Sequence, residues 1–549
     1  MSVVTATILS NGVKIDPTWE VLSLDVAKEV NRISSAQIVL LDGDAAKQAF
    51  PISDSKMFVP GREIEIKLRY EGESGSDATV FKGIVVGHRV EAGAQGSLLA
   101  VELKDTAIKM TRLRKSAVHR DQTDDKVIGS LIANAGLKKG QLEATKVTHK
   151  ELVQYYCSDW DFMLSRAEAN GLLVVANDGQ ISLQGIAMQA IAVAGEAKHA
   201  VTYGDNILSF ELEADAEQQY GSVESAAWDV KNQKLTAAAR AKGLSLAQGN
   251  LKAENMAKTI GAGKALFVSP VPLLIQELHA WSDGVMARSR MSMIRGRVAV
   301  PGIPHVALMD VVEIKGVGTR FNGKTVVTGL RHRVEGGSWQ TDVQFGISGD
   351  RFAERPDIVD VPAAGLLPAV HGLQIGIVDS FQEDPDKEFR VRVMLPGIEN
   401  KGVIWARLAS PDGGKERGLF FRPEPGDEVV VGFFNDDPRH AVILGAMYGS
   451  KNTPPKDVSK LTKDNFKKAI VTKKGTTIAF DDEKVTVFIQ TPGKNKILLD
   501  DDKKAVMLSD QHGNTITMDD KGITIKSAKD FKVEASNNVE IKGAKVDVK

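Results

Sequence analysis

The chain has 549 residues, and its 70 Lys and Arg against 71 Asp and Glu give a formal charge of -1. This balance excludes a strongly basic nucleic-acid binder and an acidic disordered tail. The single cysteine, Cys157, excludes a disulfide framework within the chain and argues against a cysteine-built metal site. No stretch approaches the ~18 apolar residues of a membrane span, and from the first residues we expect no signal peptide. The length predicts several domains.

The first part of the chain, up to about residue 360, mixes strand patterns with a few helices. Residues 63–70 alternate polar and apolar side chains, as a half-buried strand does. Residues 81–86 and 99–103 continue an antiparallel pattern. We therefore expect an α+β region in which strands supply most of the core.

The clearest helix pattern follows Ser158. Apolar residues recur after it at i, i+3, i+4 and i+7 and form one stripe, made of Trp160, Met163, Leu164 and Ala167. Ser158 with Asp161 three residues on is typical of a capped helix start, and Gly171 is typical of a helix end. A second helical region is expected over about 233–290, interrupted near residues 270–272.

Residues 318–325 satisfy the Walker A phosphate-binding pattern. A phosphate-binding loop needs a helix next, whereas residues 325–328 are rich in β-branched side chains. Asn322-Gly323 instead favours a two-residue hairpin turn that joins strands 311–314 and 325–328. The motif therefore predicts a hairpin and no nucleotide, in line with the absence of any expected cofactor.

Metal and catalytic signals are weak. Asp384, Asp386 and Glu388 resemble the start of a calcium loop, but Phe389 stands where the sharp turn needs glycine, so we expect a solvated acidic loop. The histidines are scattered, and His512 is expected at a corner of the repetitive tail. We therefore predict no metal site.

The sequence holds no G-x-S-x-G nucleophile motif. Cys157 precedes the capped helix, whose N-terminus can lower a thiol pKa, but a buried packing role fits it better. Carboxylates are plentiful, so counting alone does not exclude a glycosidase pair. No compact hydrolase-sized block remains once the zones are assigned, and we predict no catalytic residues.

Residues 366–450 are rich in strand patterns and are punctuated by Gly and Pro. Their aromatic residues could stack nucleic-acid bases; these are Trp405, Phe420, Phe421, Phe433 and Phe434. However, residues 371–450 carry 13 Asp and Glu against 9 Lys and Arg, and this net negative charge opposes phosphate binding. The aromatics are better interpreted as the core of a small barrel or as its contacts with neighbours.

Residues 451–475 are interpreted as a linker, and residues 476–549 form a repetitive tail. The tail contains apolar pairs with a spacing of two, so that both side chains of a pair point to one face of a strand. The pairs are Ile478/Phe480, Val485/Val487, Ile497/Leu499, Val506/Leu508, Ile516/Met518, Ile523/Ile525, Phe531/Val533, Val539/Ile541 and Val546/Val548. Turn-forming residues separate them, and such a short-period repeat is typical of a β-solenoid or β-helix.

One such chain is too thin to bury its own apolar pairs. Three chains wound together would pool these residues along a common axis and give each strand hydrogen-bond partners. We therefore predict a homotrimeric, intertwined triple-stranded β-helix; an ordinary antiparallel meander with hairpins is the alternative. The expected trimer core consists of Ile497, Leu499, Val506, Leu508, Ile516, Met518, Ile523, Ile525, Phe531, Val533, Val539 and Ile541.

The order of these zones resembles the VgrG and phage-baseplate hub-spike family. Residues 389–396, 405–407, 421–430, 437–438 and 442–445 look like the family's OB-fold. Upstream, residues 158–171 (SDWDFMLSRAEANG) are similar to its hub signature. Residues 317–323 with 329–332 resemble the last hub barrel, and the tail repeat resembles the spike.

The resemblance implies a hub over residues 1–360 with two tube-like barrels and helical insertions, an OB-fold collar over 366–450, a linker over 451–475 and a β-helix spike over 476–549. It implies a homotrimer that contacts a hexameric inner tube protein and baseplate proteins and transiently contacts a target membrane. A PAAR-type tip protein would dock at Val546, Asp547, Val548 and Lys549.

The function implied is that of a structural puncturing spike in a contractile injection machine, with no catalysis of its own. Only about 25 residues separate barrel and tail, so a lysozyme domain of the kind found in some phage spikes is not expected. No histidine follows His512, so a tip metal held by an H-x-H motif is not expected either. The chain would be made in the bacterial cytoplasm and become part of an assembled particle.

Two alternatives remain open: a cell-wall hydrolase carried on a spike, and a carbohydrate-binding or nucleic-acid-binding tail protein built on the OB barrel. The sequence does not distinguish a phage tail, a type VI secretion system and an extracellular injection particle. The hub sequence around Phe321-Asn322-Gly323 and the short tail, which carries no effector domain, favour a phage-like or extracellular particle.

Overall fold

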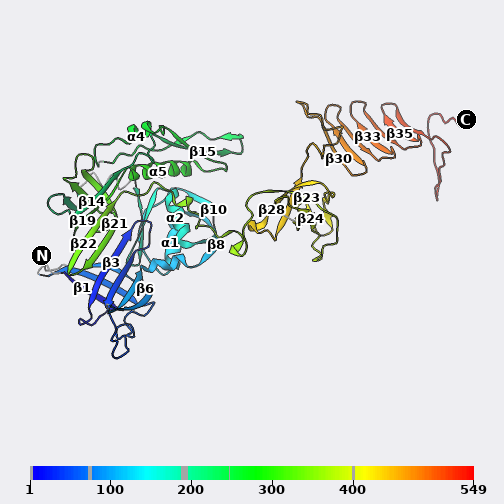
Figure 1. Cartoon of the computed structure of the whole chain (residues 1–549). Helices are drawn as coiled ribbons and strands as arrows, with labels where there is room; N and C mark the ends of the chain where they lie inside the picture. Colours follow the sequence, from blue (N-terminus) through cyan, green and yellow to red (C-terminus); the bar gives the residue numbers. More distant parts are fainter. Residues whose placement is uncertain (1–3, 72–76, 95, 187–195, 247, 399–401) are drawn as a thin grey trace. The chain divides into compact units, whose positions relative to one another are not determined.

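Figure 1 shows the protein as a computed structural model, which describes residues 4–71, 77–94, 96–186, 196–246, 248–398 and 402–549. The chain divides into two compact units, residues 1–360 and 361–549. Strands dominate both units, and the described α-helices lie in the first. The predicted fold class, mainly β with some α, is confirmed.

In the first unit, thirteen of the described strands build one large sheet, and the others form smaller sheets. Its path runs β14-β19-β22-β21-β3-β4-β7-β6-β5-β1-β2, and β20 joins β13 to β21. The strands are β1 (Val4–Ser10), β2 (Val13–Lys14), β3 (Val21–Glu29), β4 (Ser35–Leu41), β5 (Glu63–Tyr70), β6 (Ala78–Gly93), β7 (Gly96–Lys104), β13 (His199–Thr202), β14 (Ser209–Ala214), β19 (Ile294–Pro301), β20 (Val311–Lys315), β21 (Gly323–Glu335) and β22 (Ser338–Phe345).

Two separate hydrophobic cores lie along this sheet. The first gathers side chains from β1 and β3–β7, and the second gathers side chains from β19–β22. The alternation predicted for residues 63–70 is present in β5, where Ile64, Ile66 and Leu68 are at most 1% exposed. Antiparallel pairing of β21 with β3 makes the two halves one continuous sheet.

A mixed segment follows β7. It contains η1 (Thr106–Thr111), β8 (Arg114–Thr123), α1 (Asp124–Asn134), β9 (Lys138–Leu142), β10 (Thr148–Ser158), α2 (Asp159–Ala169), β11 (Leu172–Asn177) and β12 (Gln180–Gly185). The predicted helix is confirmed as α2, because its stripe of Trp160, Met163, Leu164 and Ala167 is buried. Ser158 caps it by accepting the Asp161 N–H at 3.0 Å. Gly171 follows the helix with φ +66°.

The single helical region predicted over 233–290 is wrong. The structure has β15 (Val223–Asp229), β16 (Lys234–Leu235), β17 (Ala239–Arg240), α4 (Ala253–Thr259), β18 (Ala265–Ser269) and α5 (Ile275–Ser292). The Ala, Lys and Glu content suggested a helix, but the apolar run of β18 pairs in parallel with β15. The prolines at 270 and 272 lie between β18 and α5, so the predicted interruption is present.

The second unit begins with the OB-fold barrel that the sequence predicts. The barrel closes in the order β23-β24-β25-β29-β28. Its elements, with one short helix before the barrel and one before β29, are η3 (Pro362–Gly365), β23 (Gln374–Val378), β24 (Val391–Met394), β25 (Val403–Leu408), β26 (Gly413–Gly414), β27 (Arg417–Gly418), β28 (Glu428–Phe433), η4 (Phe434–Asp436) and β29 (Ala441–Ala446). The short η2 (Phe352–Glu354) belongs to the first unit.

Of the two interpretations of the aromatic residues, the barrel core is mostly wrong, whereas contacts with neighbours stay a prediction. The core consists of small aliphatic side chains, such as Val393, Val429 and Ile443. Phe433 packs against this core, and Trp405 is half-buried. Phe420, Phe421 and Phe434 are more than half exposed. A barrel closed by few strands has room for aliphatic residues, so the large rings lie outside it.

The remaining strands form a second sheet, which we call the rod sheet; Figure 1 shows it in orange and red. The strands are β30 (Lys467–Val471), β31 (Thr477–Asp481), β32 (Thr486–Gln490), β33 (Lys496–Asp500), β34 (Ala505–Ser509), β35 (Thr515–Asp519) and β36 (Gly522–Lys526). They pair antiparallel in chain order, so within the single chain these residues form the antiparallel meander that the sequence left as the alternative, and the strands have their hydrogen-bond partners in their own chain. Its first strand, β30, lies within the stretch 451–475 that the sequence assigns to a linker.

Candidate functional site

One face of the rod sheet carries two continuous rows of apolar side chains. Directly opposed residues of paired strands share a face, and so do residues two apart within a strand. The first row is Phe480, Val487, Leu499, Val506, Met518 and Ile523. The second row is Ile470, Ile478, Ile489, Ile497, Leu508, Ile516 and Ile525. We call these two rows together the apolar face.

The register of the sheet corrects one predicted pair. Val485 lies in the turn before β32 and has φ +50°. The partner of Val487 on the apolar face is therefore Ile489, two residues after it. The predicted pair and the true pair have the same spacing of two, so spacing alone could not distinguish them.

The apolar face is uncovered in the single chain. Ile497, Leu499, Leu508 and Met518 are 38–42% exposed, and Ile523 is 70% exposed. None of the hydrophobic cores formed by the described residues includes a residue of the rod sheet. The sheet is thus a single layer whose apolar face has no second layer from its own chain, which is unstable in water without a partner.

Each reversal of the rod sheet has a residue with positive φ, either in the turn or at the first position of the next strand. In chain order these residues are Gly475, Val485, Lys494, Lys504, Gly513 and Gly522, with φ between +49° and +114°. Such residues let the chain reverse tightly between antiparallel strands. His512 lies in the turn before β35, as predicted, and its N–H donates to Asp510 at 2.9 Å.

The chain changes character after β36. Residues 527–549, which we call the tail segment, form no strand and contain no residue with positive φ. Its beginning is tied to the sheet, because the Ala528 N–H donates to the Asn514 side chain at 2.8 Å. Its apolar pairs are exposed, with fractions of 52–92% for Phe531, Val533, Val539, Ile541, Val546 and Val548.

The four residues expected to dock a tip protein end this segment. Val546 and Val548 are 53% and 92% exposed. The Asp547 carboxylate pairs with Lys545 at 2.9 Å, and Lys549 is exposed. Residues 546–549 thus present exposed apolar side chains beside a local ion pair.

The hub signature of residues 158–171 has a structural basis that the sequence did not reveal. Arg166 donates two hydrogen bonds to the buried Asp124, at 2.6 and 3.1 Å. Burial alone would raise the pKa of Asp124, but the hydrogen bonds and charge of Arg166 hold it below its usual value. His149 and Asn170 also contact Asp124, at 3.0 and 2.9 Å. The network locks α1, α2 and β10 together.

Two further signature residues fix α5. Glu168 pairs with Arg288 at 2.8 Å. Gly171 abuts Gly284 of α5 so closely that a Cβ at Gly171 would lie 2.9 Å from the Gly284 Cα. The helical end of the hub is therefore built on contacts between residues far apart in sequence.

The Walker-like motif does not form a phosphate-binding loop. Residues 324–328 continue strand β21, and β21 pairs antiparallel with β20, as predicted. The predicted two-residue Asn-Gly turn is wrong, because the connection between β20 and β21 is longer and runs from residue 316 to residue 322. The Asn322 side chain shapes this longer loop by accepting the Val317 N–H at 2.9 Å.

The acidic loop of the barrel also differs from its prediction. Asp384 is only 6% exposed, so it is not solvated. It accepts the backbone N–H groups of Asp386, Glu388 and Arg390 at 3.0–3.1 Å. The Arg390 guanidinium also binds it, and these bonds strongly lower the Asp384 pKa. This carboxylate therefore organises the loop from within.

Cys157 packs in the core around α1 and α2, in the role that the sequence favours. Burial, and next the nearby Asp161 carboxylate, raises the pKa of its thiol, which is the opposite of an activated nucleophile. Among the described residues, no His, Cys, Asp and Glu side chains gather in a group of three or more that could hold a metal ion. None of the described helices is long and apolar enough to cross a membrane.

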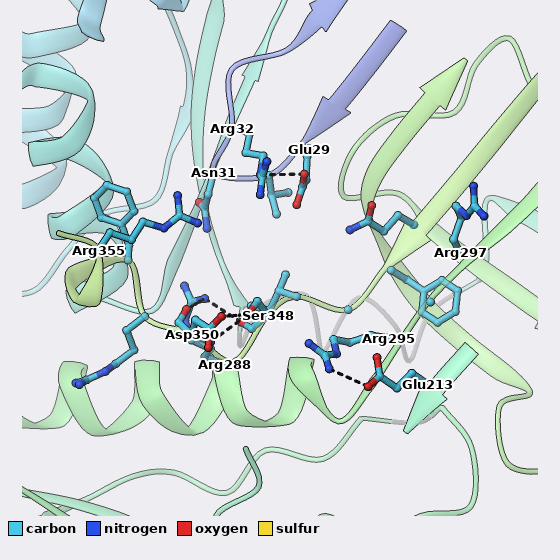
Figure 2. A pocket seen from close by; sticks show the side chains of 18 of the residues that line it. Glu29, Asn31, Arg32, Glu213, Arg288, Arg295, Arg297, Ser348, Asp350 and Arg355 are labelled. Carbon is cyan, nitrogen blue, oxygen red and sulfur yellow. Dashed lines mark hydrogen bonds and ion pairs between the residues drawn. The ribbon is translucent and has the colours of Figure 1, made fainter. Parts of the chain in front are cut away.

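A polar cleft of about 820 Å³ opens in the first unit (Figure 2). Arginine side chains line much of it, and most of them are engaged in ion pairs. Arg32 contacts Glu29 at 3.0 Å and Arg295 contacts Asp215 at 3.1 Å. Arg288 donates to the backbone carbonyls of Ser348 and Asp350. The charges of the cleft thus hold its walls together.

Three family models match the chain. Residues 1–336 match the Alg8 N-terminal domain, and residues 374–448 match the type VI secretion system/phage-baseplate injector OB domain. Residues 486–549 match the phage baseplate V C-terminal trimerisation domain. The matched regions include all strands of the large sheet except β22, the OB barrel, and most of the rod sheet with the tail segment.

Relatives include two spike proteins of type VI secretion systems. VgrG1a of Pseudomonas aeruginosa is 26% identical over 221 residues, which cover 36% of this chain and 33% of the relative. VgrG3 of Vibrio cholerae is 33% identical over 96 residues, which cover 16% of this chain and 9% of the relative. The chain thus spans a third or less of the length of these relatives.

Among solved structures, an E. coli component of the type VI secretion system is 13% identical, with a TM-score of 0.39, over 80% of this chain and 99% of that one. Over its first 336 residues the chain matches the Alg8 N-terminal domain, and its later regions match the injector OB and trimerisation domains. The matches to the injector OB and trimerisation domains and to VgrG spike proteins confirm the predicted resemblance to the VgrG and phage-baseplate hub-spike family. By its longest match, the chain belongs to the Alg8 N-terminal domain family.

Proposed function

We propose that the protein is the structural hub and puncturing spike of a contractile injection machine and works as a homotrimer. The observation that carries this proposal is the uncovered apolar face of the rod sheet. Three copies would turn these faces toward one axis and bury them against each other. The match of residues 486–549 to a trimerisation domain supports this assembly.

The trimer core would contain the residues of the apolar face from Ile497 to Ile525 and, further on, the apolar pairs of the tail segment. Full burial of one such side chain stabilises by roughly 1.5–3 kcal/mol. Because each residue is present three times, the assembled rod gains this stabilisation three times at every position of the core. A rod of this kind resists unfolding under load, since its three chains must separate together.

The hub would connect the rod to a hexameric inner tube protein and to baseplate proteins. The exposed end at residues 546–549 would dock a PAAR-type tip protein, and the rod would touch a target membrane only during puncture. In this role the chain supplies stiffness and geometry, while the contracting machine supplies the work, so no catalytic step is needed. Neither a cell-wall hydrolase nor an OB-based binding protein gains support from the relatives.

An affinity tag at the start of the chain tests this function in the producing bacterium. We expect the tagged chain to be recovered with tube and baseplate proteins, and electron microscopy with a tag-specific label to mark the spike end of the particles. A deletion strain should lose assembled particles. Normal particles in that strain, or recovery of the chain without any tube protein, would overturn the proposal.

A further inference from the structure

A separate cavity of about 360 Å³ in the first unit is lined by residues of α1, α2, β18 and α5. Its volume falls within the ~300–1,000 Å³ of ordinary ligand sites. Most of the lining is apolar and consists of Val147, Ala169, Val268, Pro270, Leu273, Ala280 and Trp281. The polar lining residues are Asp124, Arg166, Asn170, Ser269 and Glu277. A mostly apolar cavity with a few charged groups has the composition of a binding site.

The charges that line this cavity do not cancel. Arg166 is matched by Asp124, to which it donates two hydrogen bonds. Glu277 uses one carboxylate oxygen to accept the Leu274 N–H at 2.8 Å, at the start of α5. Its other oxygen lies 3.6 Å from His149 Nδ1, which is beyond hydrogen-bond distance and forms an ion pair only when that histidine is protonated. The negative charge of Glu277 therefore favours a cation in the cavity.

The walls of the cavity determine which cation fits. Trp281 is half-buried and lines it, and an indole ring attracts a cation more strongly than other aromatic rings do. Leu273 and Ala280 add aliphatic surface, on which the stem of a long side chain can pack. A guanidinium binds best to both oxygens of a carboxylate, whereas one oxygen of Glu277 already caps α5. The compact ammonium group of a lysine suits a single free oxygen better.

The chain beside the cavity exposes further apolar side chains. Val268, Val271, Leu274 and Ile275 are 46–58% exposed, and they lie in one short run from β18 to the start of α5. A free amine inside the cavity would leave these side chains in water. A protein segment would cover them around its buried lysine, as the rim of an interface surrounds its anchor residue. The surroundings of the cavity therefore favour a protein partner.

We propose that this cavity receives a lysine side chain from an exposed segment of a partner protein. The ammonium group would lie at Glu277 and the stem against Trp281, and apolar residues on either side of the lysine would cover the run from Val268 to Ile275. The inference goes beyond the proposed function, because the site lies in the first unit and depends neither on the rod nor on the number of chains.

Peptide binding to the full-length protein tests the site, at a pH above the titration range of an ordinary histidine. The probe is acetyl-Leu-Lys-Leu-amide, and acetyl-Leu-Gln-Leu-amide is its neutral control. We expect the lysine peptide to bind at least tenfold more tightly by calorimetry. Glu277→Gln, which keeps an oxygen for the cap of α5, should remove this preference. Glu151→Gln changes an exposed carboxylate outside the cavity and should keep it. Equal binding of the two peptides to the unaltered protein would overturn the proposal.

The ion n-butylammonium separates a protein partner from a free amine. It has the charge and stem of lysine without flanking residues, so we expect it to bind at least tenfold more weakly than the lysine peptide. Val271→Ser should weaken the peptide and leave n-butylammonium unchanged. Binding of n-butylammonium as tight as that of the peptide would assign the cavity to a small amine and overturn the protein partner. Trimer formation is measured separately, so the proposed function does not depend on these results.

Discussion

The large sheet of the first unit, which we call the hub sheet, and the rod sheet follow the same alternating pattern, but their apolar faces end in opposite states. In β5 of the hub, the apolar side chains are buried almost completely by other parts of the same chain. In β33 and β34 of the rod, the corresponding side chains of Ile497, Leu499 and Leu508 remain about 40% exposed. Alternation thus determines which face of a strand is apolar, but it does not determine which molecule covers that face.

The largest expected effect comes from charging the apolar face. Ile523→Asp together with Ile525→Asp would bring two carboxylates from each chain to the shared axis, where unpaired charge is very costly. We expect this variant to remain a single chain by light scattering, with the hub folded. Thr524→Asp with Lys526→Asp, on the opposite face of β36, is the control and should stay trimeric. A trimeric Ile523/Ile525 variant of normal heat resistance would show that this face is not the inner one.

The next effect concerns the hub alone. Arg166→Leu would leave the buried Asp124 carboxylate without its main partner, which typically costs about 3–5 kcal/mol. We expect a lower denaturant midpoint for the hub transition and an unchanged number of chains. Arg120→Leu removes an exposed ion pair with Glu151 and should cost at most about 1 kcal/mol. Similar midpoints for the two variants would contradict the role of the Asp124 network.

Hub stability should also depend on pH through His332. Burial lowers the pKa of His332 to about 3, so the folded hub binds fewer protons than the unfolded chain, whose histidine has a pKa near 6.5. Stability is then complete above pH 6.5 and falls as the pH drops toward 3, by about 2 kcal/mol at pH 5. Thermal unfolding of the hub at several pH values checks this. In His332→Leu the pH dependence should flatten, and an unchanged slope would exclude His332 as its source.

The smallest effect is expected at the exposed aromatics of the barrel. Phe420 is 64% exposed and stacks on Arg422, with the guanidinium carbon 5.1 Å from the ring centre. Such an exposed contact contributes about 0.5–1 kcal/mol. Phe420→Ala should therefore change the unfolding midpoint of the barrel only slightly, whereas Val393→Ala in the core should lower it clearly. Equal losses would show that Phe420 is a core residue of the assembled protein.

Local signals predicted local structure well. The cap at Ser158 and the stripe after it define α2, and the spacing of two placed most apolar pairs of the rod sheet on one face. The pairing of β20 with β21 also followed from the β-branched residues after the Walker-like motif. Each of these features depends on residues within a few positions of each other.

Features that depend on distant residues were missed. Asp124 and Arg166 are 42 positions apart, and only the spacing of four residues between Arg166 on α2 and Asn170 at its C-cap hinted at a shared target. The helical composition before α5 hid β18, because its parallel partner β15 lies far upstream. Likewise, Asp384 resembled a solvated acid until the fold showed its backbone contacts. Tertiary contacts decide these cases, and composition does not reveal them.

The number of chains in the intact protein tests the central claim most directly. Native mass measurement of the full-length chain should give a species of three copies of the 59.2 kDa chain, with no stable monomer at micromolar concentration. A stable, soluble single chain whose apolar face remains open to solvent would contradict the account.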